Sequence, residues 1–331
     1  MKILFIETEN WEQEYLKEKF AGNELVFRNR PEILPEDANT EVLCTFLGCP
    51  IAQAELEKMP NLKYIATRST GFDHIDLKAA AAKSIPVSNV PTYGENTVAE
   101  FTFALLLALS RKVYPAAKQV KEQGLFETRE LQGFDLKDKV IGVIGTGHIG
   151  TYVVKIAHGF GMKIVAYDPY PNQQLAKDFE YTYASLEELL KTSDVITLHV
   201  PYMPATHHLL NAENLKLVKP GAVLLNTSRG GLVETAGLVE ALKTGKLAGA
   251  GLDVLEEEGF VKEEAHLINN PHPNLEQIKV ALADHELMHM PNVLITPHNA
   301  FNSREAVMRI LDTTVANIQG FMNGKPANLV K

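Results

Sequence analysis

Three residues whose side chains could do chemistry together, Arg229, Glu258 and His298, each follow a short strand-like run in the second half of the chain. A guanidinium can bind a carboxylate and polarise a carbonyl group, and a protonated imidazole can donate a proton to the developing alkoxide. A neighbouring carboxylate favours the charged form of the imidazole. These residue types are the set that the reduction of a keto acid requires.

A glycine-rich turn stands at an earlier strand end, where the aliphatic run Val140–Ile144 leads into Gly145-Thr146-Gly147-His148-Ile149-Gly150 and then into a helical pattern. In this context the first glycine permits a tight turn, the second lets the backbone approach a pyrophosphate, and the third lets helix and strand pack closely. The helix N-terminus adds unpaired N–H groups for the phosphates. The pattern predicts a dinucleotide site.

An acidic residue stands at the distance from this turn that a dinucleotide site requires. Asp168 lies 18 residues beyond Gly150, at the end of the run Lys163–Tyr167. Its carboxylate can accept hydrogen bonds from both hydroxyl groups of an adenosine ribose, and its charge would repel a 2'-phosphate. The following Pro169-Tyr170 brings no arginine to bind such a phosphate, so the sequence favours NAD over NADP.

The elements around these residues alternate between strand-like runs and helical patterns, as in parallel α/β sheets. In the first half, strands are expected at Ile3–Ile6, Val42–Phe46, Leu62–Ala66 and Pro86–Ser88, and helices at Trp11–Phe20, Ile51–Lys58 and Asp76–Lys83. In the second half, strands are expected at Val140–Ile144, Lys163–Tyr167, Val195–Leu198, Ala222–Asn226, Ala248–Leu252 and Val293–Thr296, and helices at His148–Phe160, Leu186–Lys191 and Glu234–Lys243. Six strands with intervening helices match a Rossmann fold.

Two further helical segments determine the expected domain organisation. Thr97 to Arg111 is apolar on nearly every side, so we expect it to be buried, to form the first crossing between domains and to contribute to a subunit interface. Ser303 to Met322 follows the last strand and is expected to return to the first domain. The expected architecture is α/β, with two Rossmann-like domains of parallel sheets and an active site in the cleft between them. The domains are a discontinuous substrate (catalytic) domain, 1–96 plus 300–331, and an NAD-binding Rossmann domain, 97–299.

Composition narrows the class of protein. The 331 residues are 45% apolar and 22% charged, as in a globular protein, and the 41 acidic and 32 basic residues give a net charge of −9. This charge disfavours nucleic acid and anionic membranes as partners. The N-terminal run is too short for a signal peptide, and no run is long enough to cross a bilayer. Cys44 and Cys49 match no redox or zinc pattern. We expect them to be buried apolar residues of a cytoplasmic protein without a metal site.

Several motifs resemble those of the D-isomer-specific 2-hydroxyacid dehydrogenases, and they occur in the expected order over most of the chain. They are Arg68-Ser69-Thr70-Gly71-Phe72-Asp73, Tyr93-Gly94-Glu95-Asn96-Thr97-Val98-Ala99-Glu100, Leu198-His199-Val200-Pro201, Asn226-Thr227-Ser228-Arg229-Gly230, Gly251-Leu252-Asp253-Val254 with Glu258, and Thr296-Pro297-His298.

The resemblance implies a role for each of the three chemical side chains. Arg229 would orient the substrate carboxylate and polarise its carbonyl group. His298 would donate a proton to the carbonyl oxygen as a hydride arrives from the nicotinamide, and Glu258 would hydrogen-bond the imidazole and raise its pKa. The reaction is then the reduction of a small 2-keto acid to the D-2-hydroxy acid, and the family's habit of dimerising implies a homodimer.

The resemblance also implies the residues that contact cofactor and substrate. For NAD they are Gly145, Gly147, His148, Ile149, Gly150, Asp168, Val200, Pro201, Thr206, Thr227, Ser228, Arg229 and Asp253. For the substrate they are Thr70, Gly71, Tyr93, Arg229, His298 and Phe301, with the loop at Thr70 and Gly71 offering backbone amides to the carboxylate. The other histidines, including His207, His208, His285 and His289, have no motif context and are left unassigned.

Substrate identity stays open at this level. Phe301 resembles the aromatic residue that narrows the pocket of D-lactate dehydrogenases, which makes pyruvate the first choice, but Thr45-Phe46-Leu47-Gly48 does not reproduce their aromatic loop. Glyoxylate, hydroxypyruvate and branched 2-keto acids are the alternatives. Glu258 argues against a formate dehydrogenase, in which a glutamine would pair with the histidine. A non-enzymatic alternative on the same fold is a dinucleotide-sensing regulatory protein.

The sequence departs from the family pattern after Glu258. Gly259 follows where many relatives have proline, and the long stretch from Gly259 to Met290 is expected to make a surface excursion before the last strand.

Overall fold

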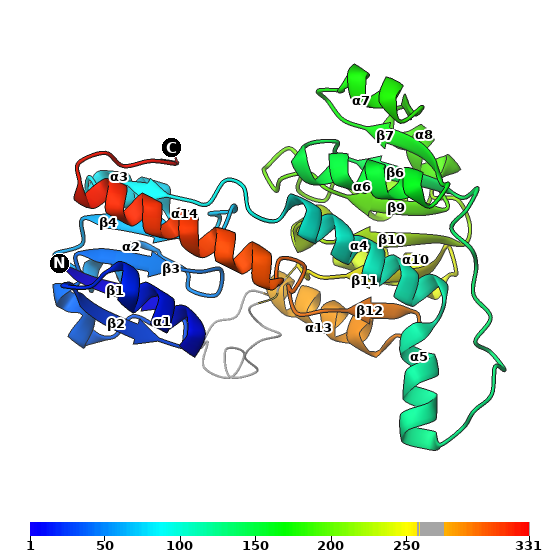
Figure 1. Ribbon diagram of the computed structural model, residues 1–331. Coiled ribbons are helices and arrows are strands. Elements are labelled where there is room, and N and C mark those ends of the chain that lie inside the picture. The colour runs from blue at the N-terminus through cyan, green and yellow to red at the C-terminus, as the bar shows by residue number, and fades with distance from the viewer. Residues whose placement is uncertain (257, 259–274, 331) are drawn as a thin grey trace. The chain divides into compact units, whose positions relative to one another are not determined.

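The computed structural model describes residues 1–256, 258 and 275–330, and the chain divides into two compact units (Figure 1). Unit 1 consists of Met1–Tyr93 and Asn302–Lys331, and unit 2 consists of Gly94–Phe301. Each unit is built on a parallel sheet with its own apolar core.

Unit 1 contains a five-stranded sheet with the order β2-β1-β3-β4-β5, and all its ladders are parallel. The strands are β1 (Lys2–Ile6), β2 (Glu24–Arg28), β3 (Val42–Thr45), β4 (Tyr64–Thr67) and β5 (Val87–Ser88). The connecting elements are α1 (Asn10–Lys19), η1 (Pro35–Asn39), α2 (Gln53–Glu57) and α3 (Leu77–Ala82), and the C-terminal helix is α14 (Arg304–Met322).

The chain reverses its direction across this sheet after β2, so right-handed crossovers place α1 on one face and α2 with α3 on the other. Helix α14 packs against β4 and lies beside α1 (Figure 1). Tyr64 of β4 stacks on Phe321 of α14 with ring centroids 4.4 Å apart. This contact and the packing of α14 against β4 and α1 place the C-terminal helix in unit 1.

Unit 2 contains a seven-stranded parallel sheet with the order β12-β11-β10-β9-β6-β7-β8. Its strands are β6 (Val140–Ile144), β7 (Lys163–Tyr167), β8 (Thr182–Tyr183), β9 (Val195–Leu198), β10 (Ala222–Asn226), β11 (Leu247–Leu252) and β12 (Val293–Ile295). The order reverses at β6, as in doubly wound dinucleotide-binding sheets, where ligands bind beyond the carboxyl ends of the strands.

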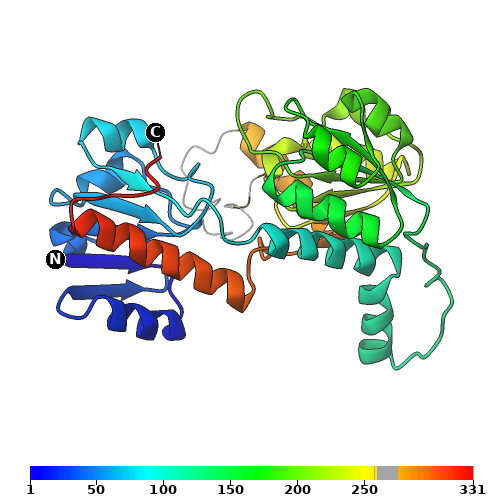
Figure 2. The same cartoon turned by 45° about the horizontal axis from the view of Figure 1, so that its top comes forward.

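The two faces of this sheet carry separate apolar cores, which helices cover (Figure 2). One face packs against α4 (Glu95–Ser110), α6 (His148–Gly159) and α7 (Gln173–Asp178). The other packs against α8 (Leu186–Thr192), α9 (Ala212–Leu215), α10 (Thr235–Lys243) and α13 (Leu275–His289). Because both faces are covered, the central strands are almost continuously apolar.

The apolar helix expected near Thr97 is α4, which begins at Glu95 and packs against α6, β10 and β11. It is buried on several faces within unit 2, as its composition indicates. The chain then continues into α5 (Val113–Lys118) and η2 (Gln119–Gln123), which extend away from the sheet (Figures 1 and 2). None of the helices within the described residues is both long and apolar enough to span a membrane.

Every strand expected from the sequence is present, but two additional strands and the helices α5, α7, α9 and α13 were not expected. Strands β2 and β8 are edge strands with a partner strand on one side only. The prediction of a surface excursion is wrong for Leu275–His289. These residues form helix α13, which packs on α10. The remainder of that stretch, 259–274, lies outside the described residues.

The two cysteines are buried and unpaired with each other, as expected. Burial raises the pKa of both Cys44 and Cys49 to about 12, so each thiol stays protonated at neutral pH.

Candidate active site

The sequence-predicted residues of unit 2 gather at one edge of its sheet. All the strands are parallel, so their carboxyl ends lie on the same side. The loops that follow β6, β7, β9, β10, β11 and β12 begin at Gly145, Asp168, His199, Thr227, Asp253 and Thr296, respectively. Groups separated by about 150 residues in the sequence, such as Gly145 and Thr296, are thereby brought to a common edge.

The glycine turn after β6 has the shape that a pyrophosphate requires. Gly145 has a φ of +94°, and a Cβ there would lie 2.6 Å from the carbonyl oxygen of His199. A Cβ on Gly150 would lie 2.0 Å from the carbonyl oxygen of Gly145. Gly147 differs, because a Cβ there would meet nothing within 4 Å, and it is the N-cap of the twelve-residue helix α6. The turn therefore leaves open space beside exposed N–H groups at a helix N-terminus, which fits a dinucleotide phosphate.

Asp168 follows β7 and lies next to this turn. Its Oδ2 accepts hydrogen bonds from the backbone N–H of Thr146, at 2.7 Å, and from the Thr146 hydroxyl, at 3.0 Å. Its Oδ1 accepts from the backbone N–H of Tyr170 at 2.8 Å. These bonds fix the carboxylate beside the glycine turn, and its two oxygens have lone pairs left for ribose hydroxyls.

The loop after β9 is closed largely by hydrogen bonds of Thr206. Thr206 Oγ1 donates to the carbonyl oxygen of Pro201 at 2.7 Å and accepts from the backbone N–H of Met203 at 2.9 Å. This closure gives the segment Pro201–Thr206 a defined shape. We call this segment the cofactor loop, because the sequence predicts NAD contacts at Pro201 and Thr206.

A direct contact joins two of the predicted catalytic side chains, His298 and Glu258. His298 Nδ1 lies 3.1 Å from Glu258 Oε2 and 3.2 Å from Oε1, across 40 residues of sequence. Both side chains are partly buried. A carboxylate that binds Nδ1 orients the ring and favours the tautomer or charge state with a proton on that nitrogen, which leaves Nε2 for exchange with a substrate oxygen.

His298 has a strained backbone that Asp253 holds in place. Its φ is +52°, a left-handed conformation that is uncommon for residues other than glycine. The buried carboxylate of Asp253 accepts the Thr296 hydroxyl at 2.5 Å and the N–H groups of Asn299 and Ala300 at 2.8 and 2.7 Å. The carbonyl oxygen of Asp253 accepts the N–H of His298 at 2.8 Å. Asp253 thus fixes the turn on both sides of His298, a role that sequence reasoning missed.

The environment of Asp253 has opposing effects on its own ionisation. Burial raises the pKa of this carboxyl group, and the hydrogen bonds from Thr296, Asn299 and Ala300 lower it, with burial the larger effect. The predicted contact of Asp253 with the cofactor stays a prediction.

Arg229 lies in a turn that the side chain of Asn226 spans. Asn226 Oδ1 accepts the N–H of Ser228 at 3.0 Å, and its Nδ2 donates to the carbonyl oxygen of Arg229 at 2.8 Å. Ser228 Oγ donates to the carbonyl oxygen of Leu198 at 2.7 Å, which ties this turn to the end of β9. The hydroxyl of Thr227 shares a 2.9 Å hydrogen bond with that of Thr102 on α4. Arg229 is therefore presented on a rigid turn at the same sheet edge as His298.

His199, directly after β9, is a buried neutral group under the glycine turn. Its Nε2 lies 2.8 Å from the Thr197 hydroxyl, and burial lowers the pKa of His199 to about 3. The unfolded chain takes up a proton on this residue near pH 6.5, whereas the folded chain does not, so the contribution of His199 lowers the stability as the pH drops from about 6.5 towards 3.

We expect His199→Gln to flatten this pH dependence. The contribution of His199 is at most about 1.4 kcal/mol for each pH unit in this window. Urea unfolding at pH 7 and pH 5 should therefore show a smaller loss of stability for His199→Gln than for the unsubstituted protein. His158→Gln, at an exposed position on α6, is the matched control and should keep the original slope. An unchanged slope in His199→Gln would contradict the assignment.

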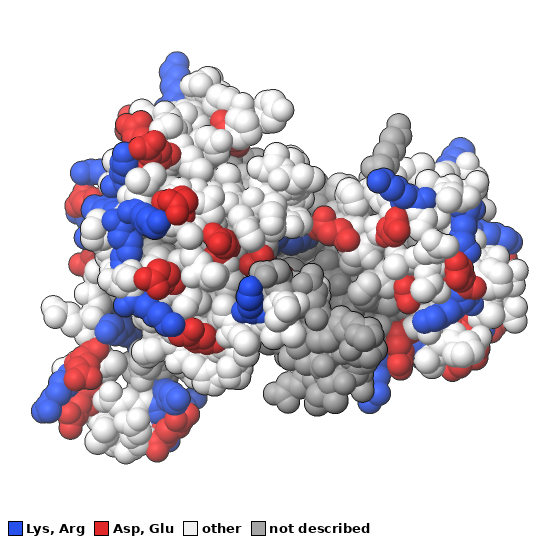
Figure 3. Space-filling model, turned by 180° about the vertical axis from the view of Figure 1, so that it is seen from behind, with Lys and Arg blue, Asp and Glu red and all other residues white. Residues whose placement is uncertain are grey.

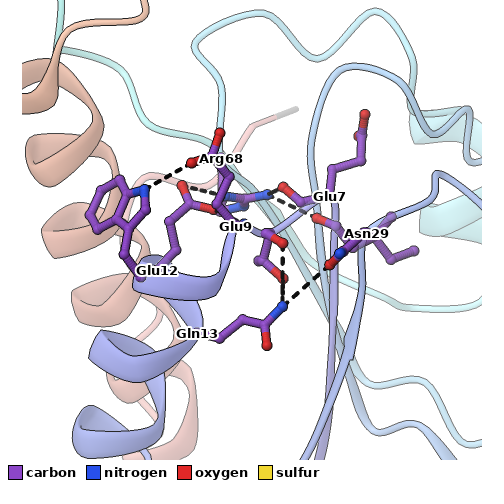
Figure 4. A network of polar contacts seen from close by, with 9 residues as sticks. Glu7, Glu9, Glu12, Gln13, Asn29 and Arg68 are labelled. Carbon is purple, nitrogen blue, oxygen red and sulfur yellow. Dashed lines mark hydrogen bonds and ion pairs between the residues drawn. The ribbon is translucent and has the colours of Figure 1, made fainter.

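The predicted substrate loop of unit 1 begins at a buried arginine (Figure 4). The Arg68 guanidinium donates to both oxygens of Glu12 at 3.3 Å, to the carbonyl oxygen of Ile6 at 2.8 Å, and to that of Glu7. It also lies 5.1 Å from the centre of the Phe46 ring. These contacts join the carboxyl ends of β1 and β4 and fix the start of the loop.

The following loop is held by its own side chains. Ser69 Oγ donates to the carbonyl oxygen of Gly71 at 2.6 Å, and Thr70 Oγ1 donates to that of Val90 at 2.8 Å. Because the Thr70 hydroxyl is engaged in this way, the loop can bind an anion mainly through its backbone. The assignment of Thr70 and Gly71 to the substrate stays a prediction.

Two further predicted substrate residues lie at the ends of the units. The carbonyl oxygen of Tyr93, in unit 1, accepts a 2.5 Å hydrogen bond from Arg309 Nε on α14. Phe301 is the last residue of unit 2 and is partly buried, one residue beyond the Ala300 N–H that Asp253 binds. Their roles are likewise untested predictions.

Charged side chains of both signs are interspersed on the face that Figure 3 shows. No large area of one charge is visible on this face. Among the described residues, no group of three or more His, Cys, Asp or Glu side chains could hold a metal ion.

Comparison with known proteins assigns the family. Residues 103–300 match the family model described as "D-isomer specific 2-hydroxyacid dehydrogenase, NAD binding domain". A 2-hydroxyacid dehydrogenase homolog of Zymomonas mobilis is 35% identical, covering 98% of both chains. A hydroxypyruvate reductase of Blautia hydrogenotrophica is 37% identical over 85% of this chain and 82% of that protein.

A solved structure of similar architecture agrees with this match. The D-lactate dehydrogenase of Aquifex aeolicus, in complex with NAD and lactic acid, superposes with a TM-score of 0.87 at 35% identity, covering 99% of this chain and 98% of that chain. The similarity covers both parallel sheets, and the family match covers the NAD-binding domain. The chain therefore belongs to the D-isomer specific 2-hydroxyacid dehydrogenase family.

Proposed function

We propose that this enzyme reduces a small 2-keto acid to its D-2-hydroxy acid with NADH, and that pyruvate is the first candidate substrate. The observation that carries the proposal is the 3.1 Å contact between His298 and Glu258 at the sheet edge that also bears Arg229 and the glycine turn. A proton donor oriented by a carboxylate is what the reduction of a carbonyl group needs.

Each of the three side chains has its own role in the proposed reaction. NADH supplies the hydride that reduces the carbonyl carbon. Arg229 binds the substrate carboxylate with its planar guanidinium and draws electron density toward the carbonyl oxygen. His298 donates the Nε2 proton to that oxygen as negative charge develops, while Glu258 stays hydrogen-bonded to Nδ1. In the oxidative direction His298 takes the hydroxyl proton back.

The cofactor is held by backbone groups more than by side chains. The N–H groups around Gly147 and at the start of α6 would bind the pyrophosphate, and Asp168 would bind the ribose hydroxyls. Support for this placement comes from the open space at Gly147 and from the fixed carboxylate beside it.

Support for pyruvate comes from Phe301, which would narrow the pocket, and from the D-lactate dehydrogenase of similar fold. The hydroxypyruvate reductase of similar sequence makes hydroxypyruvate the main competitor. One experiment separates them: the purified protein is mixed with NADH and pyruvate, hydroxypyruvate, glyoxylate or a branched 2-keto acid, and the loss of NADH absorbance is followed. The order of kcat/KM ranks the substrates, and the chirality of the product tests the D configuration. NADH binding without turnover of any of them would reject the enzymatic proposal in favour of dinucleotide sensing.

We also propose that the enzyme is a homodimer and that α5 and η2 contribute to the contact. Apolar side chains are exposed along this segment, among them Val113, Tyr114 and Val120, and Phe126 just beyond it is 93% exposed. A hollow of about 460 Å³, lined by Arg111, Leu131 and Phe134 among others, lies at the base of the same segment. Exposed apolar patches of this kind mark protein contacts, and a two-fold contact would bring the same patch of each subunit together.

We expect Phe126→Glu to shift the protein from dimer toward monomer, because it would bury a charge in an apolar contact. Light scattering after size-exclusion chromatography measures the mass. Tyr170→Glu, at a similarly exposed aromatic residue outside the segment, is the control and should leave the mass unchanged. A monomeric unsubstituted protein would refute the proposal.

A further inference from the structure

Glu256 lies two residues before Glu258 and, unlike a solvent-facing carboxylate, has both oxygens bound. Oε1 lies 2.5 Å from His208 Nε2, and Oε2 accepts the backbone N–H of Thr235 at 3.2 Å and its hydroxyl at 2.8 Å. Its side chain is only 12% exposed. Thr235 is the first residue of α10, so the carboxylate also lies at the positive end of that helix.

The His208 contact connects Glu256 to the cofactor loop, which ends two residues earlier. His208 has a left-handed backbone with a φ of +49°, and its ring stacks on His207 with centroids 3.8 Å apart. His207 Nδ1 in turn lies 3.1 Å from the Tyr202 hydroxyl of the cofactor loop. A continuous chain of contacts therefore runs from Glu256 to that loop.

The turn that carries Arg229 packs against the backbone at Glu256. A Cβ on Gly230 would lie 1.9 Å from the carbonyl oxygen of Leu255 and 2.4 Å from the N atom of Glu256. The N–H of His208 donates to the carbonyl oxygen of Gly231 at 2.9 Å. The loops after β9, β10 and β11 thus meet at Glu256. The loop after β10 contacts its backbone through Gly230, and the loop after β9 contacts its carboxylate through His208.

We propose that Glu256, anchored by His208 and Thr235, is a positioning residue that sets the location of Glu258 and thereby the orientation of His298. Glu256 and Glu258 are two residues apart in the sequence, so the anchoring of Glu256 restricts where Glu258 can lie. Errors of about 1 Å in catalytic geometry can lower rates by about 100-fold. This inference rests on the proposed function only for its kinetic consequence, since the arrangement of the side chains stands without it.

The kinetic test is a double-mutant cycle. Glu256→Gln keeps the shape of the side chain but removes the charge, and we expect kcat to fall about 10-fold or more. In the Glu258→Gln background the same change should have little further effect, because the group that Glu256 positions is already lost. Equal effects of Glu256→Gln in both backgrounds, or an unchanged kcat in the single variant, would overturn the proposal.

Two further variants separate positioning from folding. His208→Leu breaks the contact with Oε1 but leaves Thr235 in place, so it should lower kcat by a smaller factor, whereas His208→Gln can still donate to Glu256 and should restore most of it. Glu213→Gln, at an 84% exposed carboxylate on α9, is the matched control and should leave kcat unchanged. A failure of His208→Gln to exceed His208→Leu would contradict the role of the hydrogen bond.

A spectroscopic readout makes the test independent of turnover. The proton between His298 Nδ1 and Glu258 should give a downfield NMR resonance, identified by its loss in His298→Ala. We expect Glu256→Gln to shift or broaden this resonance and Glu213→Gln to leave it in place. If no keto acid is reduced, the proposed function fails while this signal still decides the positioning role. An unmoved resonance in Glu256→Gln would refute it.

Discussion

Replacing His298 with alanine is expected to lower kcat by about 10²- to 10⁴-fold while NADH binds within about threefold of its original affinity, because proton transfer commonly contributes a factor of this size. His298 lies in a loop that Asp253 holds through hydrogen bonds to Thr296, Asn299 and Ala300, so these anchors survive the loss of the imidazole. Steady-state kinetics and NADH fluorescence titration measure the two quantities.

The left-handed backbone of His298 calls for a second variant. Alanine at a φ of +52° is strained, whereas asparagine adopts this conformation more readily and cannot replace the imidazole in proton transfer. His298→Asn should therefore show the same loss of kcat with a thermal midpoint close to that of the unsubstituted enzyme. Loss of both NADH binding and folding in both variants would instead indicate a structural histidine.

The second large effect is expected from alanine substitutions at two glycines of the turn after β6, which should impair the protein for different reasons. A Cβ on Gly150 would lie 2.0 Å from the carbonyl oxygen of Gly145, so Gly150→Ala must displace backbone and should destabilise the fold by about 1–3 kcal/mol or more. A Cβ on Gly147 meets nothing, so Gly147→Ala should fold almost normally. It should nevertheless weaken NADH binding about 10-fold or more, because the new methyl group stands where the pyrophosphate approaches.

Thermal unfolding and NADH titration distinguish the two outcomes. Gly159→Ala is the matched control, since this position at the end of the same helix also has open space and lies away from the turn. It should change neither quantity appreciably. Unaltered NADH affinity in Gly147→Ala would remove the turn from the cofactor site.

Much of the fold follows from local pattern, and the exceptions are instructive. Strands with apolar runs, such as Val140–Ile144 and Ala222–Asn226, were predictable because both faces of the sheet are covered. Strands β2 and β8 were not, because neither contains a fully buried residue and β2 has only three apolar residues between Glu24 and Arg28. Helix α13 was missed because its exposed Leu275 and Leu282 obscure the apolar face that packs on α10.

By itself the sequence determined the chemical identities: the alternation of strands and helices, the glycine turn with Asp168, and the presence of an arginine, a glutamate and a histidine at later strand ends. These are local features, because spacing and residue type express them directly. The tertiary structure decided which of these groups touch. Residue type does not distinguish Glu256 from Glu258, and only the resemblance to the family motif singled out Glu258; in the structure Glu256 binds His208 and Thr235, and Glu258 binds His298. The physical reason is that the direction of each side chain depends on how the loops after β9, β10, β11 and β12 pack against one another, and those contacts join residues that are far apart in the sequence.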